Sequence, residues 1–129
     1  EYPDFIIATS EWFKMTDAHP FFSHVGDHAD ELETSVMMHY HPELVNLSEA
    51  GQGDSRGFGI KALSEDKVWI PRNWAKVSRD TGIGSPAKAT AEKGARFAAA
   101  VVEKYVEFLA DFARVETIDD LYEPQSHNE

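Results

Sequence analysis

The sequence predicts an α/β fold, and three observations carry that prediction. A short apolar run near the start, residues 5–8, is typical of a strand covered on both faces. Two later segments, 58–63 and 67–70, are rich in strand-forming residues. The segment 86–113 carries apolar residues at helical spacing. A helix of that length, roughly 40 Å, can cover a whole face of a sheet.

The first predicted strand leads into a loop that is rich in aromatic residues. Trp12 and Phe13 come first, and Phe21 and Phe22 follow shortly before His24. Loops at the strand ends of open α/β sheets are common places for ligands to bind. We therefore expect ligand contacts from this loop. Core packing is the alternative for its aromatic residues.

The densest group of ionisable side chains lies in residues 27–35. It supplies one imidazole and four carboxylates, which are groups that carry protons near neutral pH and bind divalent metals. Gly26 permits a tight turn just before it. Asp30 followed by Glu33 has the form of a capping box, which predicts a helix that starts after Asp30. In the alternative interpretation these two carboxylates only cap a helix, and His28 is an exposed loop residue.

The second half of the chain opens with a glycine-rich loop at 51–57. The candidate strands 58–63 and 67–70 are predicted to pair as a hairpin, and Trp69 and Trp74 are expected to pack structurally. Ser85 and Pro86 predict the start of the last helix, as N-cap and first helical residue. We expect a close backbone contact at Gly94, because glycine costs a helix about 1 kcal/mol. The apolar stripe of this helix is predicted to lie in the core: Phe97, Val101, Tyr105, Phe108 and Phe112.

Composition limits the classes of partner. The chain has 129 residues, and its formal net charge of −11 argues against nucleic acid and anionic membranes as partners. It has no cysteine, so histidine and carboxylate oxygens are the available metal ligands. No signal-like or membrane-spanning apolar run is present, which predicts a cytoplasmic protein. A signal peptide on a preceding segment would not be visible in this sequence.

Two blocks of the sequence resemble one known family. The first, His28-Ala29-Asp30-Glu31-Leu32-Glu33-Thr34-Ser35, is similar to the His-Ala-Gly-x-x-Glu-Thr-Ser signature of the creatininase family, also called creatinine amidohydrolases. The second runs from Gly82-Ile83-Gly84-Ser85-Pro86 to Ala89-Thr90-Ala91-Glu92-Lys93-Gly94, and it resembles the segment that opens the family's last helix. The blocks occur in the family's order, and the similarity spans most of residues 5–113.

The resemblance implies a three-layer α/β/α fold with a mostly parallel sheet. It also implies a hydrolase with two divalent metals, zinc or manganese, that opens cyclic amides or related C–N bonds. The family's Glu-x-His-Gly-x-His-Leu-Pro and Asn-Gly-His segments supply most metal ligands, and both are absent here. We therefore expect residues 1–114 to be the C-terminal part of such a domain, with 115–129 as an acidic tail or subunit-contact arm. A missing N-terminal half or a companion chain would supply the other ligands, and the family implies a homo-oligomer, commonly a hexamer.

The resemblance also assigns roles to residues of this chain. Metal-activated water, whose pKa falls to about 7 on zinc, attacks a planar carbon. His28 donates a proton to the departing nitrogen or oxygen, and Asp27 orients its ring. Glu33 completes the metal shell or holds a ligand from outside it. The expected substrate contacts are Trp12, His24 and Glu31.

Two departures from the family pattern leave the substrate open. His24 stands where some creatininases have a tryptophan, and Asp30 replaces the glycine of the signature. An oxidised cyclitol or a sugar lactone therefore remains an alternative to a lactam. The alternative function, from another class, is a non-catalytic subunit or binding module that keeps the fold.

Overall fold

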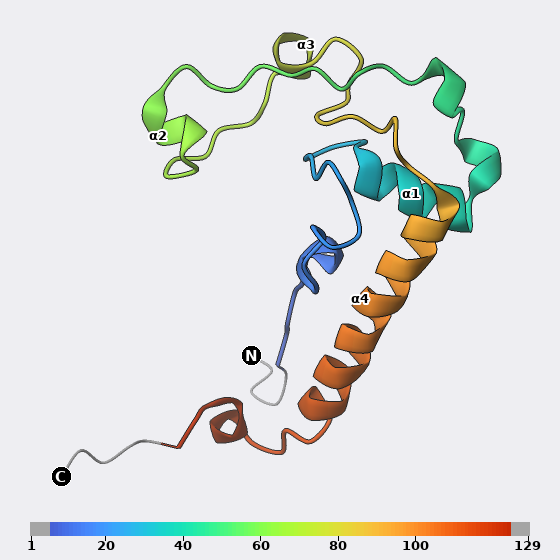
Figure 1. Ribbon diagram of the computed structural model, residues 1–129. Helices are drawn as coiled ribbons and strands as arrows, with labels where there is room; N and C mark the ends of the chain where they lie inside the picture. Colours follow the sequence, from blue (N-terminus) through green and yellow to red (C-terminus); the bar gives the residue numbers. More distant parts are fainter. Residues whose placement is uncertain (1–5, 125–129) are drawn as a thin grey trace. The chain divides into compact units, whose positions relative to one another are not determined.

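The computed structural model describes residues 6–124, which form two compact units. The central unit comprises residues 17–99, and the terminal unit comprises the described residues on either side, 6–16 and 100–124. The α-helices and 3-10 helices (η) are shown in Figure 1, in chain order: η1 (Trp12–Lys14), α1 (Glu31–Tyr40), η2 (Pro42–Leu44), η3 (Leu47–Glu49), α2 (Lys61–Ser64), α3 (Trp74–Val77), α4 (Ala91–Phe112) and η4 (Ile118–Leu121).

Helix α1 begins where the sequence predicts it. Asp30 has extended backbone angles, and its carboxylate accepts a hydrogen bond from the Glu33 N–H at 2.9 Å. This bond satisfies one of the free amide groups at the helix start. The side chain of Glu33 turns back to the Ala29 N–H at 2.6 Å, one residue earlier than a standard capping box would place it.

Helix α4 starts later than the sequence predicts. Ser85 and Pro86 were the expected start, but Pro86 instead opens a turn in which the Ala89 N–H donates to Pro86 O at 2.8 Å. The hydroxyl of Thr90 then accepts from the Lys93 N–H at 3.2 Å, so Thr90 caps the helix. Both Ser85 and Thr90 suit an N-cap, and tertiary contacts of Thr90 decide between them.

The core of the central unit forms where α1 packs against the first turns of α4 (Figure 1). Phe97 has no exposed surface, and its ring lies 5.5 Å from that of Phe21 and 5.3 Å from that of Phe22. The expected close contact at Gly94 is confirmed, because a Cβ there would lie 2.0 Å from Ser35 O. Glycine at this position therefore lets the backbones of α1 and α4 approach closely.

The terminal unit holds the rest of the predicted apolar stripe. Val101 is buried, while Phe108 is 38% exposed and stacks on Phe112 at 5.4 Å. The hydroxyl groups of Ser10 and Tyr105 lie 2.6 Å apart. The stripe is therefore core at its first two positions and partly open toward its end.

The predicted hairpin of 58–63 and 67–70 is wrong in this structure. Residues 61–64 form α2 instead, because Ser64 and Glu65 donate their N–H groups to Ile60 O and Lys61 O at 3.0 Å each. The ion pair of Lys61 with Glu65 at 3.6 Å supports the same local turn. Trp69, which was expected to pack, is 82% exposed.

The predicted strand at residues 5–8 is not formed in its described part. Phe5 lies outside the described residues, and residues 6–8 have no regular structure, with Ile7 85% exposed. A strand needs a neighbour for its hydrogen bonds, and within residues 6–124 the β pairing consists of two isolated antiparallel bridges, His28 with Ile83 and Ser55 with Ser78. No helix in these residues is long and apolar enough to cross a membrane.

Candidate functional site

The loop that carries His28 is fixed to the segment around Ile83. The N–H groups of Asp27 and His28 donate to Ile83 O at 2.8 and 3.2 Å, and the Ile83 N–H donates to His28 O at 2.8 Å. Gly26 lies so close that a Cβ there would be 2.3 Å from Ile83 O. The two sequence blocks that carry the family resemblance therefore meet at this loop.

The start of α1 fixes the other side of the same loop. Asp30 is 3% exposed, and its second carboxylate oxygen accepts from the Gly26 N–H at 2.6 Å. Ala29, between His28 and Asp30, has a φ of 49°, in the left-handed region that favours glycine. The hydrogen bonds on both sides hold this strained residue in place, and they set the direction in which His28 leaves the backbone.

His28 is surrounded by a carboxylate and an aromatic ring. Its Nδ1 lies 3.7 Å from a carboxylate oxygen of Glu33, and its ring centre lies 5.0 Å from that of Trp74. The side chains of His28 and Glu33 are 47% and 41% exposed, so both are accessible to a ligand. An accessible imidazole beside a carboxylate is suited to proton transfer.

Asp27 points to a different partner. Its carboxylate forms an ion pair with Arg72, whose guanidinium lies 5.8 Å from the ring centre of Trp74. Because Trp74 contacts the rings of both His28 and Arg72, the four side chains form a connected group. A cavity of about 220 Å³ opens beside Asp27 and Arg72, with Phe58, Leu63 and Ile83 among its apolar walls.

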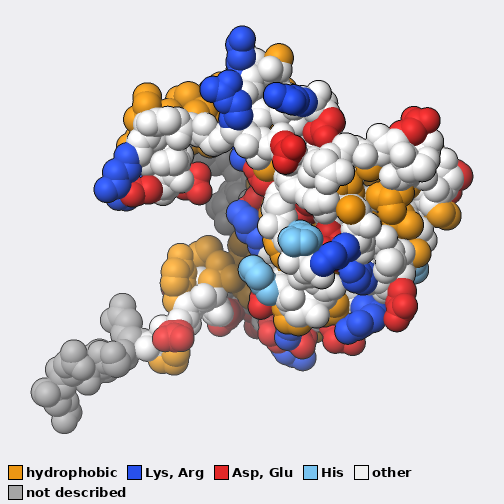
Figure 2. All heavy atoms as spheres, turned by 45° about the horizontal axis from the view of Figure 1, so that its top comes forward, with side chains coloured by type: hydrophobic (Ala, Val, Ile, Leu, Met, Phe, Trp, Pro, Cys, Tyr) orange, Lys and Arg blue, Asp and Glu red, His pale blue; other side chains and the backbone are white. Residues whose placement is uncertain are grey.

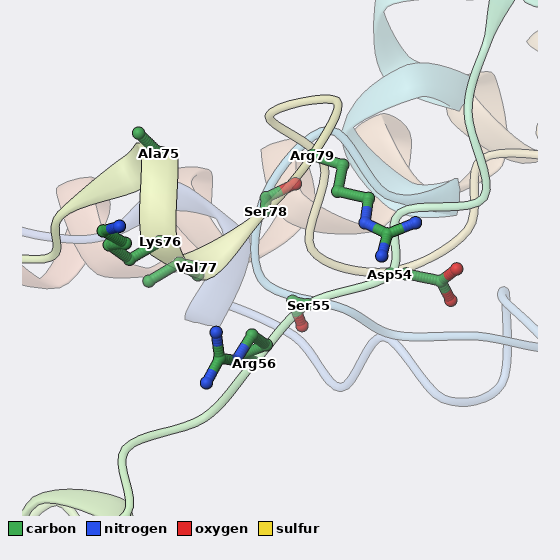
Figure 3. A pocket seen from close by; sticks show the side chains of 8 residues that line it. All are labelled: Asp54, Ser55, Arg56, Ala75, Lys76, Val77, Ser78 and Arg79. Carbon is green, nitrogen blue, oxygen red and sulfur yellow. The ribbon is translucent and has the colours of Figure 1, made fainter.

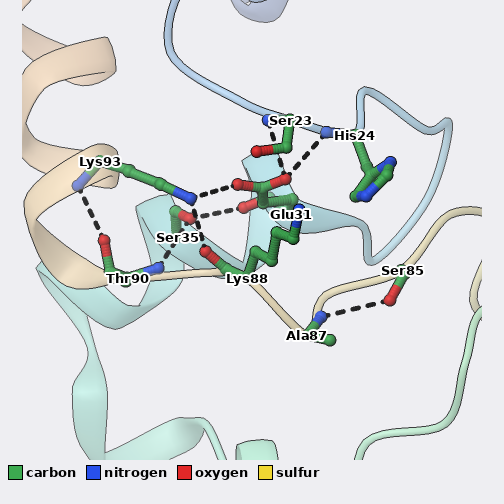
Figure 4. A network of polar contacts seen from close by, with 9 residues as sticks. All are labelled: Ser23, His24, Glu31, Ser35, Ser85, Ala87, Lys88, Thr90 and Lys93. Atoms are coloured by element: carbon green, nitrogen blue, oxygen red, sulfur yellow. Dashed lines mark hydrogen bonds and ion pairs between the residues drawn. The ribbon is translucent and has the colours of Figure 1, made fainter.

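Glu31 lies at the centre of a buried polar network (Figure 4). Its side chain has no exposed surface, and one carboxylate oxygen accepts from the N–H groups of Ser23 and His24 at 3.0 and 2.9 Å. The other oxygen accepts from the Lys93 ammonium at 2.5 Å, and Lys93 also donates to Lys88 O at 2.8 Å. This network joins the loop before His28 to the first turn of α4.

The charge of Glu31 depends on this network. Burial on its own would raise the pKa of Glu31, but hydrogen bonds from Lys93, His24 and Ser23 outweigh burial and lower the pKa below its ordinary value of 4.5. Glu31 is therefore ionised at neutral pH. Ser35 extends the network, because its hydroxyl donates to Glu31 O at 2.6 Å and accepts from the Thr90 N–H at 3.1 Å.

The predicted site residues thus lie in two places. Asp27, His28 and Glu33 gather at the start of α1, and the backbone of His24 is anchored by Glu31 just before them. Trp12 belongs to η1 in the terminal unit, where its ring meets that of Phe13 edge-on at 5.9 Å. Within residues 6–124 there is no group of three or more His, Asp or Glu side chains placed to hold a metal ion.

Three residues of this region were not predicted from the sequence as site residues: Arg72, Trp74 and Lys93. Trp74 was assigned to packing, and its contact with His28 spans a long stretch of chain. Lys93 lies in the second block of the resemblance, next to its last residue, Gly94, and it pairs with Glu31 of the first block. The joint occurrence of the blocks was the available signal for that pair.

The family can now be decided. The family model described as "Creatininase: Creatinine amidohydrolase" matches residues 3–109. The chain belongs to the creatininase family. The matched residues include both blocks and every predicted site residue.

A solved structure supports the same family and its fold. The chain is 50% identical to a protein from Bacteroides fragilis NCTC 9343, named "Putative creatinine amidohydrolase", with a TM-score of 0.83. The similarity covers 95% of this chain and 47% of that protein, so the chain spans about half the length of the solved relative. The fold is therefore creatininase-like. No protein with curated annotation matches the chain.

Proposed function

We propose that this chain forms part of a metal-dependent hydrolase of the creatininase type. The observation that carries the proposal is the position of His28. Its side chain is accessible and lies beside Glu33 and Trp74. It directly follows Asp27, which lines the cavity of about 220 Å³. Family membership supports a hydrolase. The substrate would be a cyclic amide or a related small polar ring, with an oxidised cyclitol or lactone as the alternative.

In this proposal His28 transfers the proton to the departing nitrogen or oxygen. The carboxylate of Glu33 lies 3.7 Å from Nδ1 of His28, on one side of the imidazole that serves as the donor. Asp27 completes the catalytic pair of the proposal, and its carboxylate forms the ion pair with Arg72 at the cavity wall. Trp74 limits the movement of the imidazole ring, since it packs against one side of His28.

Glu33 is the residue that we propose for the metal centre. One of its oxygens accepts from the Ala29 N–H, which leaves the other carboxylate oxygen as a donor for a divalent cation. We propose zinc or manganese, two per complete site, with the other ligands outside this chain. A metal bound there would supply activated water at neutral pH.

The proposed substrate contacts are His24 and Trp12, and Glu31 supports His24 indirectly. Glu31 has no exposed surface, so its contribution is to hold the backbone of His24 and thereby position the exposed His24 side chain. Trp12 is 37% exposed, which leaves ring surface for an apolar contact.

For the complete protein we propose the three-layer α/β/α fold with a mostly parallel sheet, of which this chain supplies the C-terminal half. The 47% coverage of the solved relative supports a half-length part, and the absent Glu-x-His-Gly-x-His-Leu-Pro segment favours the C-terminal half. Exposed apolar side chains in residues 60–74, with Trp69 82% exposed, support a homo-oligomer or a covering companion segment. We propose the cytoplasm as its location. Light scattering that gives the mass of one copy would contradict the oligomer.

The test of the proposed function uses the complete protein and two variants. His28→Ala should retain the metal and lose about 10² to 10⁴ in rate on a cyclic amide or lactone. Glu33→Gln should lower the metal content in elemental analysis, since the amide keeps the hydrogen bond from Ala29 but loses the charge.

Matched controls exist for both variants. His19 is an exposed histidine with its own carboxylate partner, Asp17 at 2.8 Å, so His19→Ala should leave the rate unchanged. Glu43 pairs with His41 at 3.4 Å, so Glu43→Gln is the control for Glu33→Gln and should leave the metal content unchanged. Full activity of His28→Ala would contradict the proposed role.

The second candidate function is a non-catalytic subunit or binding module. The absence of a metal-binding cluster within residues 6–124 is the observation that favours it. Measurement of the intact mass of the purified assembly separates the two, because the hydrolase needs a polypeptide that carries the remaining ligands. A complete assembly that contains no such segments and no metal would favour the binding module.

A further inference from the structure

A second cavity, of about 470 Å³, lies between the segments 54–56 and 75–79 of the central unit (Figure 3). Three cationic side chains, Arg56, Lys76 and Arg79, line it with a single carboxylate, Asp54. The volume lies within the range of about 300–1,000 Å³ that is typical of small-molecule sites. In Figure 2, Lys and Arg side chains gather at the top of the view, in the region of α3.

The basic lining contrasts with the rest of the molecule. The chain carries a net charge of −11, yet in the described residues no carboxylate oxygen lies within 4.0 Å of the charged nitrogens of Arg56, Lys76 or Arg79. Of the nine other Lys and Arg side chains, two, Lys88 and Arg96, also have no carboxylate partner in the described part of the chain, whereas seven do: Lys14, Lys61, Lys67, Arg72, Lys93, Lys104 and Arg114. Unpaired cations gathered around a cavity form a field that attracts anions.

The two segments that carry the cations are held together at the bottom of the cavity. Ser55 and Ser78 form an antiparallel bridge, in which the Arg56 N–H donates to Val77 O at 2.8 Å. The Ser78 hydroxyl donates to Gly82 O at 2.7 Å, which fixes the second segment to the block that also holds His28. The positions from which Arg56, Lys76 and Arg79 extend are therefore fixed, while their side chains are exposed and able to close on a ligand.

The cavity has two chemically different ends (Figure 3). Arg56 and Lys76 lie at one end, and Arg79 lies with Asp54 at the other, with Ser55 between them. The first end combines two positive charges with no carboxylate, which matches the charge of a phosphate monoester, about −1.5 to −2 at pH 7. Arginine and lysine are also the usual side-chain partners of phosphate oxygens. The second end offers both a donor and an acceptor to hydroxyl groups.

We propose that this cavity binds a phosphorylated small molecule of sugar size. Its phosphate would lie between Arg56 and Lys76, and its hydroxyl groups would contact Asp54, Ser55 and Arg79. No aromatic side chain lines the cavity, so it offers no stacking surface to the base of a nucleotide. The proposal is independent of the hydrolase function, although Ser55, Arg56 and Val77 also line the cavity beside Asp27.

Calorimetric titration of the complete protein tests the proposal. The metal is first removed by dialysis against a chelator, so that phosphate binding to metal does not contribute. Inorganic phosphate, glucose 6-phosphate and glucose are titrated at constant ionic strength. We expect glucose 6-phosphate to bind more tightly than inorganic phosphate, and glucose to bind weakly or not at all.

Three variants locate the binding. Lys76→Gln removes a charged hydrogen-bond donor. It should weaken the binding of inorganic phosphate and of glucose 6-phosphate about tenfold or more. Asp54→Asn should weaken the binding of glucose 6-phosphate but not of inorganic phosphate, because only the sugar reaches the end of the cavity that holds Asp54. Lys88→Gln is the control, since Lys88 is an exposed lysine that does not line the cavity. Each substitution is at an exposed residue, and a thermal transition like that of the wild type verifies the fold.

Three outcomes would overturn the proposal. One is the absence of phosphate binding by the complete protein. Another is binding that Lys76→Gln and Lys88→Gln change equally, since that pattern indicates a general charge effect. A change of oligomer mass in Lys76→Gln with unchanged phosphate affinity also overturns it, because the cations would then serve a subunit contact.

Discussion

The ammonium nitrogen of Lys93 lies 2.5 Å from a carboxylate oxygen of Glu31, and the Glu31 side chain has no exposed surface. The two residues are 62 positions apart in the chain. Their ion pair connects the first turn of α4 to the backbone of Ser23 and His24, which Glu31 also binds. The loop that carries the candidate proton donor is therefore held in part by a lysine that does not touch it.

Loss of Lys93 should be costly. Lys93→Met leaves the Glu31 carboxylate buried without its cation, and breaking a buried pair in this way costs about 3–5 kcal/mol of unfolding free energy. Denaturant titration measures this change. Lys104→Met is the matched control, because the pair of Lys104 with Glu107 at 2.8 Å is exposed and its loss should change stability little. Equal effects of the two substitutions would contradict the importance of the buried pair.

The same pair should make stability depend on pH in the acid range. The folded pKa of Glu31 is below its ordinary value of 4.5, so the unfolded chain takes up the proton first as the pH falls. The contribution is therefore complete above about pH 4.5 and declines as the pH falls through the folded pKa. The difference in unfolding free energy between wild type and Glu31→Gln should narrow as the pH falls below the ordinary pKa of 4.5. A difference that is constant over this range would contradict the assignment.

Gly94 should tolerate no side chain. In Gly94→Ala the new Cβ would meet Ser35 O at 2.0 Å, so α1 and α4 must separate, at a cost of about 1–3 kcal/mol or more. Gly57→Ala is the control, because no atom lies within 4 Å of a Cβ built there. Thermal unfolding of both variants checks the prediction. A stabilised Gly94→Ala, as helix propensity alone predicts, would show that the helices do not approach this closely in solution.

Asp30 should matter for both the helix and the loop. Asp30→Ala removes the acceptor for the Glu33 N–H and for the Gly26 N–H. We expect a loss of about 1–2 kcal/mol, the upper part of the range for an N-cap. Hydrogen exchange at these two amides should also accelerate, whereas Asp30→Asn keeps one good acceptor and should lie between wild type and alanine. Unchanged protection of the Glu33 and Gly26 amides from hydrogen exchange in Asp30→Ala would contradict the proposal that Asp30 binds both.

The features that the sequence predicted are those that depend on neighbours in the chain. The N-cap at Asp30 follows from the three-residue spacing to Glu33 and is confirmed. The close contact at Gly94 was predicted from the unfavourable placement of glycine within a helix, and it is also confirmed. The roles of His28 and Glu33 remain predictions, although the structure brings these two residues within 3.7 Å.

The features that the sequence missed depend on distant partners. Residues 58–63 have strand propensity, but a strand requires a pairing segment, and without one the local hydrogen bonds of α2 are formed. Thr90 rather than Ser85 caps α4, since the Thr90 N–H is also bound by Ser35 of α1. The ion pair of Asp27 with Arg72 has no periodic or local signal, so spacing alone could not predict it.

The bonds between the loop of His28 and Ile83 have a consequence for how the protein can vary. They close residues 29–82 into one long segment whose two ends lie side by side. The entropic cost of such closure grows slowly with length, by about 0.6 kcal/mol for each doubling. Residues can therefore be inserted or exchanged in the exposed loops of this segment, away from Arg72 and Trp74, without moving the backbone of His28 or Glu33. Both cavities draw most of their walls from this segment, so the choice of ligand can diverge while the candidate site residues His28 and Glu33 keep their positions.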